Sequence, residues 1–85
     1  MILVTGGTGL VGSHILLKLA KIGENFKALK RSSSSLGICK RVFSFDNANT
    51  LFDNINWVEG DVNDIPSLTE GMKGCEKLIH CAAIV

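Results

Sequence analysis

Glycines at a fixed spacing near the start of the chain form a candidate phosphate-binding loop. Gly6, Gly7, Gly9 and Gly12 lie within the stretch VTGGTGLVGSHILLKL. A phosphate can approach the start of a helix only where the loop before it turns sharply and no Cβ blocks the backbone N–H groups. Gly6 would allow the turn, Gly9 would let a pyrophosphate lie on the backbone, and Gly12 would let the helix pack close to the sheet. The pattern fits two registers, one that begins at Gly6 and one that begins at Gly7.

The segments on either side of the glycines favour this interpretation. Met1 to Val4 is a short apolar run typical of a buried strand, and helical spacing begins directly after the loop. The expected buried face of that helix carries Val11, Ile15, Leu19 and Ile22. A Walker A loop is excluded because no lysine follows Gly12. An ordinary structural turn is the alternative.

Basic residues follow the next predicted strand, Phe26 to Leu29. Five Lys and Arg residues stand between Glu24 and Asp46 without an acid, in a chain whose net charge is +1. A fold that selects NAD usually places an acid about 20 residues beyond the glycines, whereas an arginine accommodates the 2′-phosphate of NADP. Lys30 and Arg31 occupy that place, so the sequence favours NADP over NAD. The alternative is that both are solvated loop cations.

The rest of the chain continues to alternate between strands and helices. We expect a polar loop at Ser32 to Ser35, a short helix within residues 46–54 and a third strand at Ile55 to Glu59. Asp64 and Pro66 indicate the start of a helix that runs to Lys73. A fourth strand is expected at Lys77 to Cys81. This order predicts the α/β class, with a right-handed, doubly wound parallel sheet of about four strands.

Composition limits the size of the domain and the kinds of partner and cellular location that we expect. The chain has 85 residues, 46% hydrophobic and 20% charged, which is enough for one small globular domain. A net charge of +1 gives no reason to expect nucleic acid or a membrane as partner. Three cysteines without metal-ligand spacing favour reduced thiols in a cytoplasmic protein. The uncharged start of the chain lacks the basic region of a signal peptide.

Four segments together resemble the extended short-chain dehydrogenases/reductases, the family of NAD(P)-dependent epimerases, dehydratases and dihydroflavonol-reductase-like enzymes. They are TGGTGLVGSH, ALKRSS, VEGDVND and HCAAIV, each at the carboxyl end of a predicted strand. The resemblance implies a Rossmann-type fold, of which residues 1–85 would be the N-terminal part. The remainder of the domain and the substrate region would be absent. It is compatible with a homodimer of the full-length protein.

The resemblance also implies which residues contact the cofactor. Asp61 would accept from the adenine amino group and Val62 would contact the ring, although Asp61 is equally suited to begin a turn. Small residues at the fourth strand would leave room for the ribose and nicotinamide side. We interpret His80 as a hydrogen-bonded core residue and Trp57 as buried. The predicted cofactor-binding set is Gly6, Thr8, Gly9, Leu10, Val11, Gly12, Lys30, Arg31, Asp61, Val62, Cys81, Ala82 and Ala83.

Catalytic residues are not expected in this segment. Family members that carry out chemistry use a Tyr-x-x-x-Lys pair for proton transfer, and this chain has no tyrosine. The segment alone is therefore predicted to be inactive, as part of an NADP-dependent oxidoreductase, epimerase or dehydratase with a small organic substrate. Two alternatives stay open: an NADP-binding or sensing module without turnover, and a complete small protein with an unrelated glycine turn.

Overall fold

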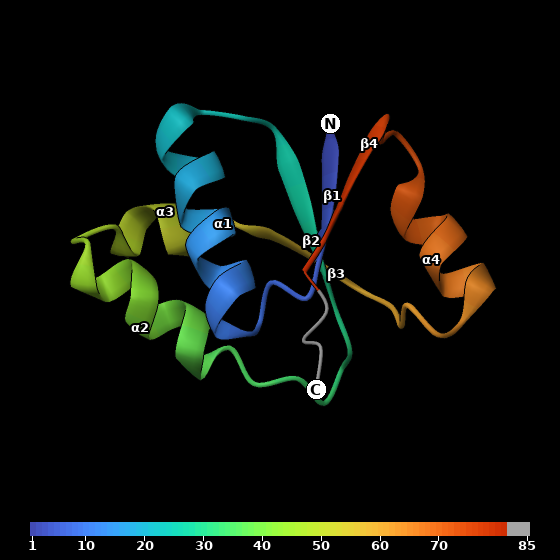
Figure 1. The fold of residues 1–85 in the computed structure, drawn as a ribbon, viewed down its shortest axis with the longest axis horizontal. Helices are drawn as coiled ribbons and strands as arrows, with labels where there is room; N and C mark the ends of the chain where they lie inside the picture. Colours follow the sequence, from blue (N-terminus) through green and yellow to red (C-terminus); the bar gives the residue numbers. More distant parts are fainter. Residues whose placement is uncertain (82–85) are drawn as a thin grey trace.

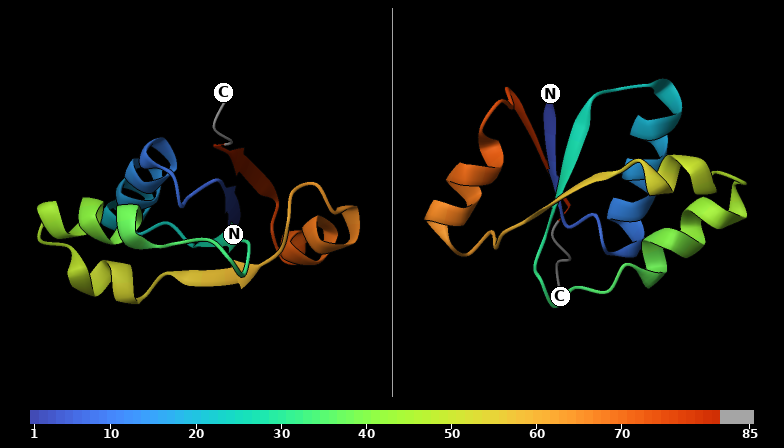
Figure 2. Two further views of the ribbon diagram at one scale, coloured as in Figure 1. Left: turned by 90° about the horizontal axis from the view of Figure 1, so that it is seen from below. Right: turned by 180° about the vertical axis from the view of Figure 1, so that it is seen from behind.

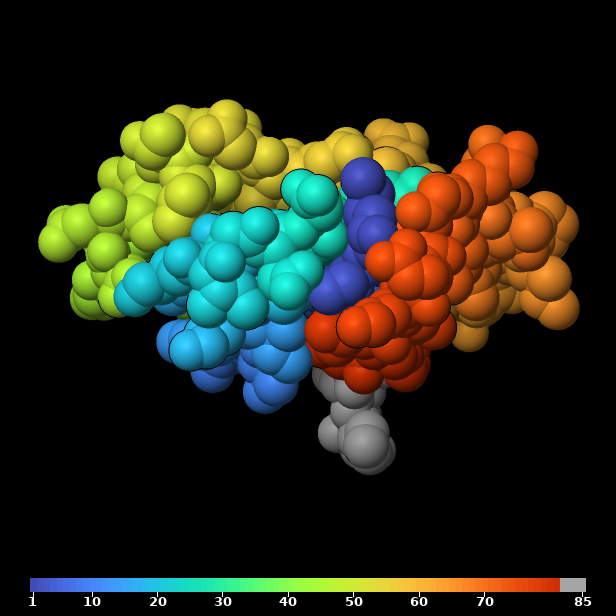
Figure 3. Space-filling model, turned by 90° about the horizontal axis from the view of Figure 1, so that it is seen from above, coloured from blue at the N-terminus to red at the C-terminus, as the bar shows by residue number. Residues whose placement is uncertain are grey.

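A parallel β-sheet forms the centre of the molecule (Figure 1). The computed structural model describes residues 1–81, which contain four strands: β1 (Ile2–Thr5), β2 (Phe26–Lys30), β3 (Asn56–Glu59) and β4 (Lys77–His80). The strand order is β3-β2-β1-β4, and every neighbouring pair is parallel. The space-filling view shows β1 lying between the β2 and β4 segments (Figure 3). Because all strands point the same way, their carboxyl ends meet at one edge, as the sequence predicted.

Helices cover both faces of the sheet (Figures 1 and 2). On one face lie α1 (Leu10–Ile22), α2 (Gly37–Phe45) and α3 (Asn49–Asp53), and α4 (Ile65–Met72) covers the other. This is the doubly wound α/β arrangement expected from the alternation of elements. None of the helices in residues 1–81 is both long enough and apolar enough to span a membrane.

The main core lies between the sheet and the three helices on its first face. Its buried members include Val4, Leu16, Ala28 and Phe43, and the Phe43 ring meets Phe52 edge-on at 5.7 Å between centroids. These side chains come from β1, α1, β2, α2 and α3, so the first 55 residues pack around one centre. This packing fixes the position of α1 relative to the end of β1.

The sequence-based prediction for the inner face of α1 was wrong in part. Leu19 is buried as expected, but Val11 and Ile22 are 69% and 58% exposed. The other buried residues of the helix are Gly12, Ser13 and Leu16. The buried face of the helix therefore begins with two small residues, Gly12 and Ser13, and lies to one side of the face defined by Val11 and Ile22. Hydrophobic spacing alone does not identify small residues such as Gly12 and Ser13 as buried contact positions.

Helix α2 was missed, whereas the other elements lie close to their predicted bounds. Its N-cap residue, Leu36, makes no side-chain cap, and the serine that accepts from Gly37 N, Ser35 at 3.2 Å, belongs to a run of four serines that the sequence presents as a loop. Its buried residues, Cys39, Val42 and Phe43, do have helical spacing and could have revealed it. Gly23 has the left-handed conformation expected at the end of α1, with φ of 78°. Trp57 is half-buried rather than buried.

Candidate functional site

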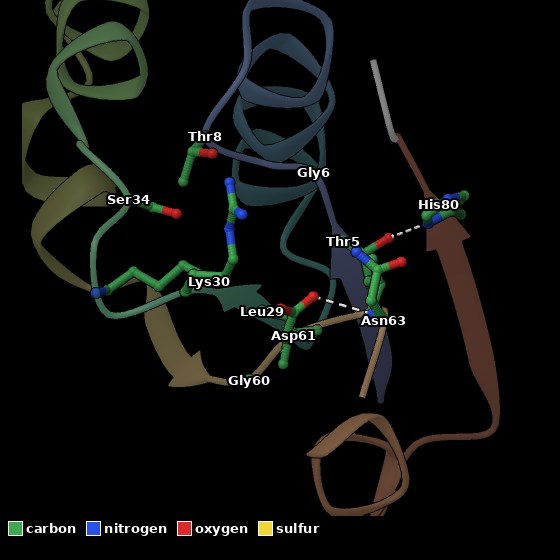
Figure 4. A pocket seen from close by; sticks show the side chains of 12 residues that line it. Thr5, Gly6, Thr8, Leu29, Lys30, Ser34, Gly60, Asp61, Asn63 and His80 are labelled. Atoms are coloured by element: carbon green, nitrogen blue, oxygen red, sulfur yellow. Dashed lines mark hydrogen bonds between the residues drawn. The ribbon is translucent and has the colours of Figure 1, made fainter. Parts of the chain in front are cut away.

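A cavity of about 350 Å³ opens at the carboxyl ends of the strands (Figure 4). It is bordered by the β1–α1 loop, the end of β2, the β3–α4 loop and the end of β4. In open α/β sheets, ligands bind at this edge. The lining residues are Thr5, Gly6, Thr8, Leu29, Lys30, Arg31, Ser34, Gly60, Asp61, Val62, Asn63 and His80.

The glycine-rich loop turns sharply as soon as β1 ends. Gly6 has φ of 74°, a conformation that L side chains rarely adopt, and its carbonyl accepts a hydrogen bond from Gly9 N at 3.3 Å. A Cβ added to Gly12 would lie 2.1 Å from Gly6 O and 2.8 Å from Gly7 Cα. Gly12 therefore lets α1 press against the backbone of the loop. The sequence predicted close packing on the sheet, and the contact is instead with the turn that leaves it.

The start of α1 provides donors for an anion. Gly9 caps the helix without a side-chain hydrogen bond, and the first turn contains no acid. The N–H groups of a first helical turn, here Leu10, Val11 and Gly12, have no partner within the helix. A Cβ at Gly9 would meet only Gly6 O, at 3.7 Å, so the space above Gly9 is open. The helix dipole and these donors together favour a negative group at this point.

The predicted loop residues divide into two groups by geometry. Gly6 and Thr8 line the cavity, whereas Gly9, Leu10, Val11 and Gly12 are not among its lining residues. The side chains of Leu10 and Val11 are 61% and 69% exposed on the outside of the helix. Any contribution of these two residues must therefore come from their backbone.

Two cations line the same cavity as the glycine-rich loop. Lys30 ends β2 and is half-buried, and Arg31 follows it as an exposed residue. Arg31 also lines an adjoining cavity of about 390 Å³. That cavity is lined by Arg31, Ser32, Ser33, Glu59, Gly60, Asp61 and Ser67.

The adjoining cavity is also lined by Glu59, an acid that the sequence did not indicate as part of the site. Glu59 pairs with Lys30 in the register of β3 and β2, and the predicted residue Asp61 follows two residues later. Along the chain, no acid lies between Glu24 and Asp46. Cross-strand pairing brings Glu59 to the same edge from another strand. The sequence could have indicated Glu59 as a site residue, because it lies at the end of a predicted strand.

Asp61 takes part in a tight turn and also lines both cavities. Its Oδ1 accepts a hydrogen bond from Asn63 N at 2.9 Å, and its own N–H donates to Ser67 Oγ at 3.0 Å. The alternative role as a turn residue is therefore present in the structure. Neighbouring Val62 is 38% exposed and lines the first cavity. The predicted contacts of both residues with adenine stay predictions.

At the far end of the cavity, β1 and β4 are joined by side chains. Thr5 is buried, and its hydroxyl is hydrogen-bonded to His80 Nδ1 (Figure 4). His80 is exposed at the cavity, so the hydrogen bond was predicted correctly and the core position was not. Cys81 N donates to Thr5 O at 2.9 Å, and burial raises the pKa of the Cys81 thiol. Ala82 and Ala83 lie outside the described residues.

Sequence reasoning missed several lining residues that lie at the carboxyl ends of strands or within four residues beyond them. Leu29, Ser34, Gly60 and Asn63 all line the first cavity, as does Thr5 at the end of β1. Each lies at or just beyond the carboxyl end of a strand that was predicted. Listing every residue at those ends would have found most of them.

Comparison with known proteins agrees with this geometry. Residues 2–85 match the model of the family described as "NAD dependent epimerase/dehydratase family". The chain belongs to this family. Membership supports a dinucleotide-binding, oxidoreductase-like segment with a Rossmann-type fold, as the sequence predicted.

Individual relatives align with nearly the whole of this chain, but the aligned region is only a small part of each relative. A Synechocystis protein provisionally named a dihydroflavonol 4-reductase is 41% identical over 94% of this chain and 20% of its own length. The sterol-4-alpha-carboxylate 3-dehydrogenase (decarboxylating) of Dictyostelium discoideum is 34% identical over 96% and 22%. A solved structure of AtPrR2 with NADP+ and (+)pinoresinol is 27% identical, with a TM-score of 0.70, over 99% and 26%. The chain thus spans about a fifth of the length of these curated relatives.

Proposed function

We propose that this chain binds the adenosine and pyrophosphate part of a nicotinamide dinucleotide, with NADP preferred over NAD. The observation that carries the proposal is one cavity lined by Gly6 and Thr8 of the loop that leads into the acid-free start of α1 and by Lys30 and Arg31. A dinucleotide carries negative charge at its pyrophosphate, and NADP carries a second negative group at the ribose 2′ position. The two donor regions have the chemistry to bind one group each.

The residues present fit such a cofactor. The open space above Gly9 and the left-handed turn at Gly6 form a cradle that a side chain would fill. The loop and the N–H groups of α1 would hold the pyrophosphate, and Arg31 would hold the 2′-phosphate with two parallel hydrogen bonds while Lys30 adds a point charge. Asp61 would accept from the adenine amino group, and Val62 would contact the ring. When bound, the cofactor supplies a nicotinamide that can carry a hydride.

The larger function follows from family membership and is part of the same proposal. The chain would be the cofactor-binding segment of a reductase, epimerase or dehydratase that acts on a small organic molecule. Both curated relatives are named as oxidoreductases, and AtPrR2 was solved with NADP+ and a small organic ligand. The 85 residues contain no tyrosine, so a tyrosine-dependent proton transfer would require residues outside them. The segment by itself would be inactive.

Calorimetric titration of NADPH and NADH against the full-length gene product tests the cofactor preference. We expect NADPH to bind at least tenfold more tightly than NADH, a difference of about 1.4 kcal/mol. Arg31→Ala should remove this difference by weakening NADPH alone. Arg41→Ala is the matched control, because Arg41 is also an exposed arginine but lines neither strand-end cavity.

The outcomes distinguish binding of the dinucleotide as a whole from recognition of the 2′-phosphate of NADP. Equal losses for both cofactors in Arg31→Ala would show that the arginine does not bind the 2′-phosphate. Tighter binding of NADH by the wild type would overturn the NADP preference. Binding of neither cofactor would leave the glycine loop as a structural turn.

A further inference from the structure

Ser13 forms a hydrogen bond to the glycine-rich loop from the buried face of α1. It lies one residue after Gly12 on the inner face of α1, and it is completely buried. Its hydroxyl donates a hydrogen bond to Gly7 O at 3.0 Å, and its N–H donates to Gly9 O at 2.9 Å. One residue therefore binds two carbonyls of the loop, on the side away from the cavity.

The Ser13 hydroxyl has a second neighbour, the thiol of Cys39. Cys39 is completely buried in α2, and its thiol lies near the Ser13 side chain. Burial raises the pKa of the Cys39 thiol, and the neighbouring Ser13 hydroxyl lowers it by a smaller amount. The side-chain hydrogen bond that links Ser13 to the loop is the one from its hydroxyl to Gly7 O.

We propose that Ser13 is a positioning residue for pyrophosphate binding. This inference rests on the proposed function. A loop with several glycines has many accessible conformations, so ordering it when a ligand binds costs conformational entropy. The Ser13 bonds remove part of that freedom in advance. The bond from the Ser13 hydroxyl also satisfies the carbonyl of Gly7, which is buried.

A panel of ligands distinguishes positioning from general stability. NADPH, NADH and ADP-ribose all carry a pyrophosphate, whereas adenosine 2′-monophosphate does not. In the full-length gene product, Ser13→Ala should weaken the three pyrophosphate ligands by a common factor of about five to ten, the scale of one lost hydrogen bond. The affinity for adenosine 2′-monophosphate should be unchanged, because its phosphate would contact Arg31 and not the loop.

Ser13→Cys supplies the second test. It keeps a side chain of the same shape but offers Gly7 O only a weak donor, so the pyrophosphate ligands should weaken by a smaller common factor than in Ser13→Ala. This variant also serves as the test if Ser13→Ala does not fold. Val42→Ala is the matched control, because Val42 is a core residue of α2 that lines neither strand-end cavity. It should lower stability without changing the ratio of affinities.

Each outcome has a defined meaning. A wild type that binds none of the four ligands overturns the proposed function and this inference with it. A wild type that binds the pyrophosphate ligands, with unchanged affinities in Ser13→Ala and Ser13→Cys, overturns the inference alone. Equal weakening of all four ligands would show a structural role only and would also overturn it.

Discussion

Gly9 and Gly12 should respond in opposite ways to the same substitution. They are three residues apart and both belong to the predicted pyrophosphate loop, yet their surroundings differ. A Cβ at Gly12 would lie 2.1 Å from Gly6 O and 2.8 Å from Gly6 C, both backbone atoms. A Cβ at Gly9 would lie 3.7 Å from Gly6 O, an ordinary contact distance. Alanine at Gly12 should therefore damage the fold, and alanine at Gly9 should damage binding.

The magnitude for Gly12→Ala follows from the size of the clash. Neither contact atom belongs to a flexible side chain, so the loop or the helix must move as a unit. Overpacking of this kind costs about 3 kcal/mol at the upper end of its usual range. Replacing glycine by alanine inside a helix by itself raises the free energy of unfolding by about 1 kcal/mol. We expect Gly12→Ala to lower the free energy of unfolding by about 2 kcal/mol.

For Gly9→Ala the stability terms nearly cancel. The residue has φ of −84° and ψ of 175°, which any L-residue can adopt. Alanine is a poorer helix cap than glycine, but it also reduces the entropy of the unfolded chain by about 0.4–1 kcal/mol. The net change in unfolding free energy should be within about 0.5 kcal/mol. Its methyl group would occupy the open space where the pyrophosphate is expected, so NADPH and NADH should both bind at least about tenfold more weakly.

Urea unfolding and calorimetric titration of the same two variants provide the assay. Unfolding midpoints report the free energy of the fold, and the titrations report the dissociation constants. The reasoning would be refuted by a Gly9→Ala variant that binds as wild type, since no ligand would then lie above Gly9. A Gly12→Ala variant as stable as wild type would equally refute the close approach of α1 to the loop.

Two further substitutions test the other side of the cavity. Glu59→Gln should tighten NADPH by about two- to fivefold and leave NADH unchanged, because it removes a carboxylate from the cavity that Arg31 lines. Weaker NADH binding in this variant would instead mean that Glu59 accepts from a ribose hydroxyl. Asp61→Ala should weaken both cofactors by a similar factor, since adenine is common to both, and the titrations above measure it. Loss of only one cofactor would contradict the adenine assignment.

Local patterns predicted the fold well because the strands and most helices here carry their own signals. Short apolar runs ended by glycine or polar residues identified all four described strands, and Pro66 and Gly23 indicated helix ends near their observed places. Helix α2 escaped because its N-cap residue, Leu36, makes no side-chain cap and its stability comes from packing Cys39 and Phe43 into the shared core. Such a helix is defined by its neighbours more than by its own sequence.

The inner face of α1 illustrates the same limit within a single helix. Periodicity correctly predicted a helix, but it selected Val11 and Ile22 as core residues, and both are exposed. The helix is oriented by the contact of Gly12 with the loop backbone, and a residue without a side chain contributes nothing to a hydrophobic pattern. Ser13 was overlooked for a related reason, because its role depends on which carbonyl its hydroxyl reaches.

The sequence by itself determined the alternation of elements, the glycine loop and the absence of an acid between Glu24 and Asp46, since these are properties of residue type and order. Tertiary structure decided which residues from separate strands share the cavity. Parallel pairing brought Glu59 beside Lys30 and joined Thr5 to His80. Packing of α2 against α1 buried Cys39 near Ser13. Such relations depend on distances between segments far apart in the chain, and those distances arise only when the sheet and its helices assemble.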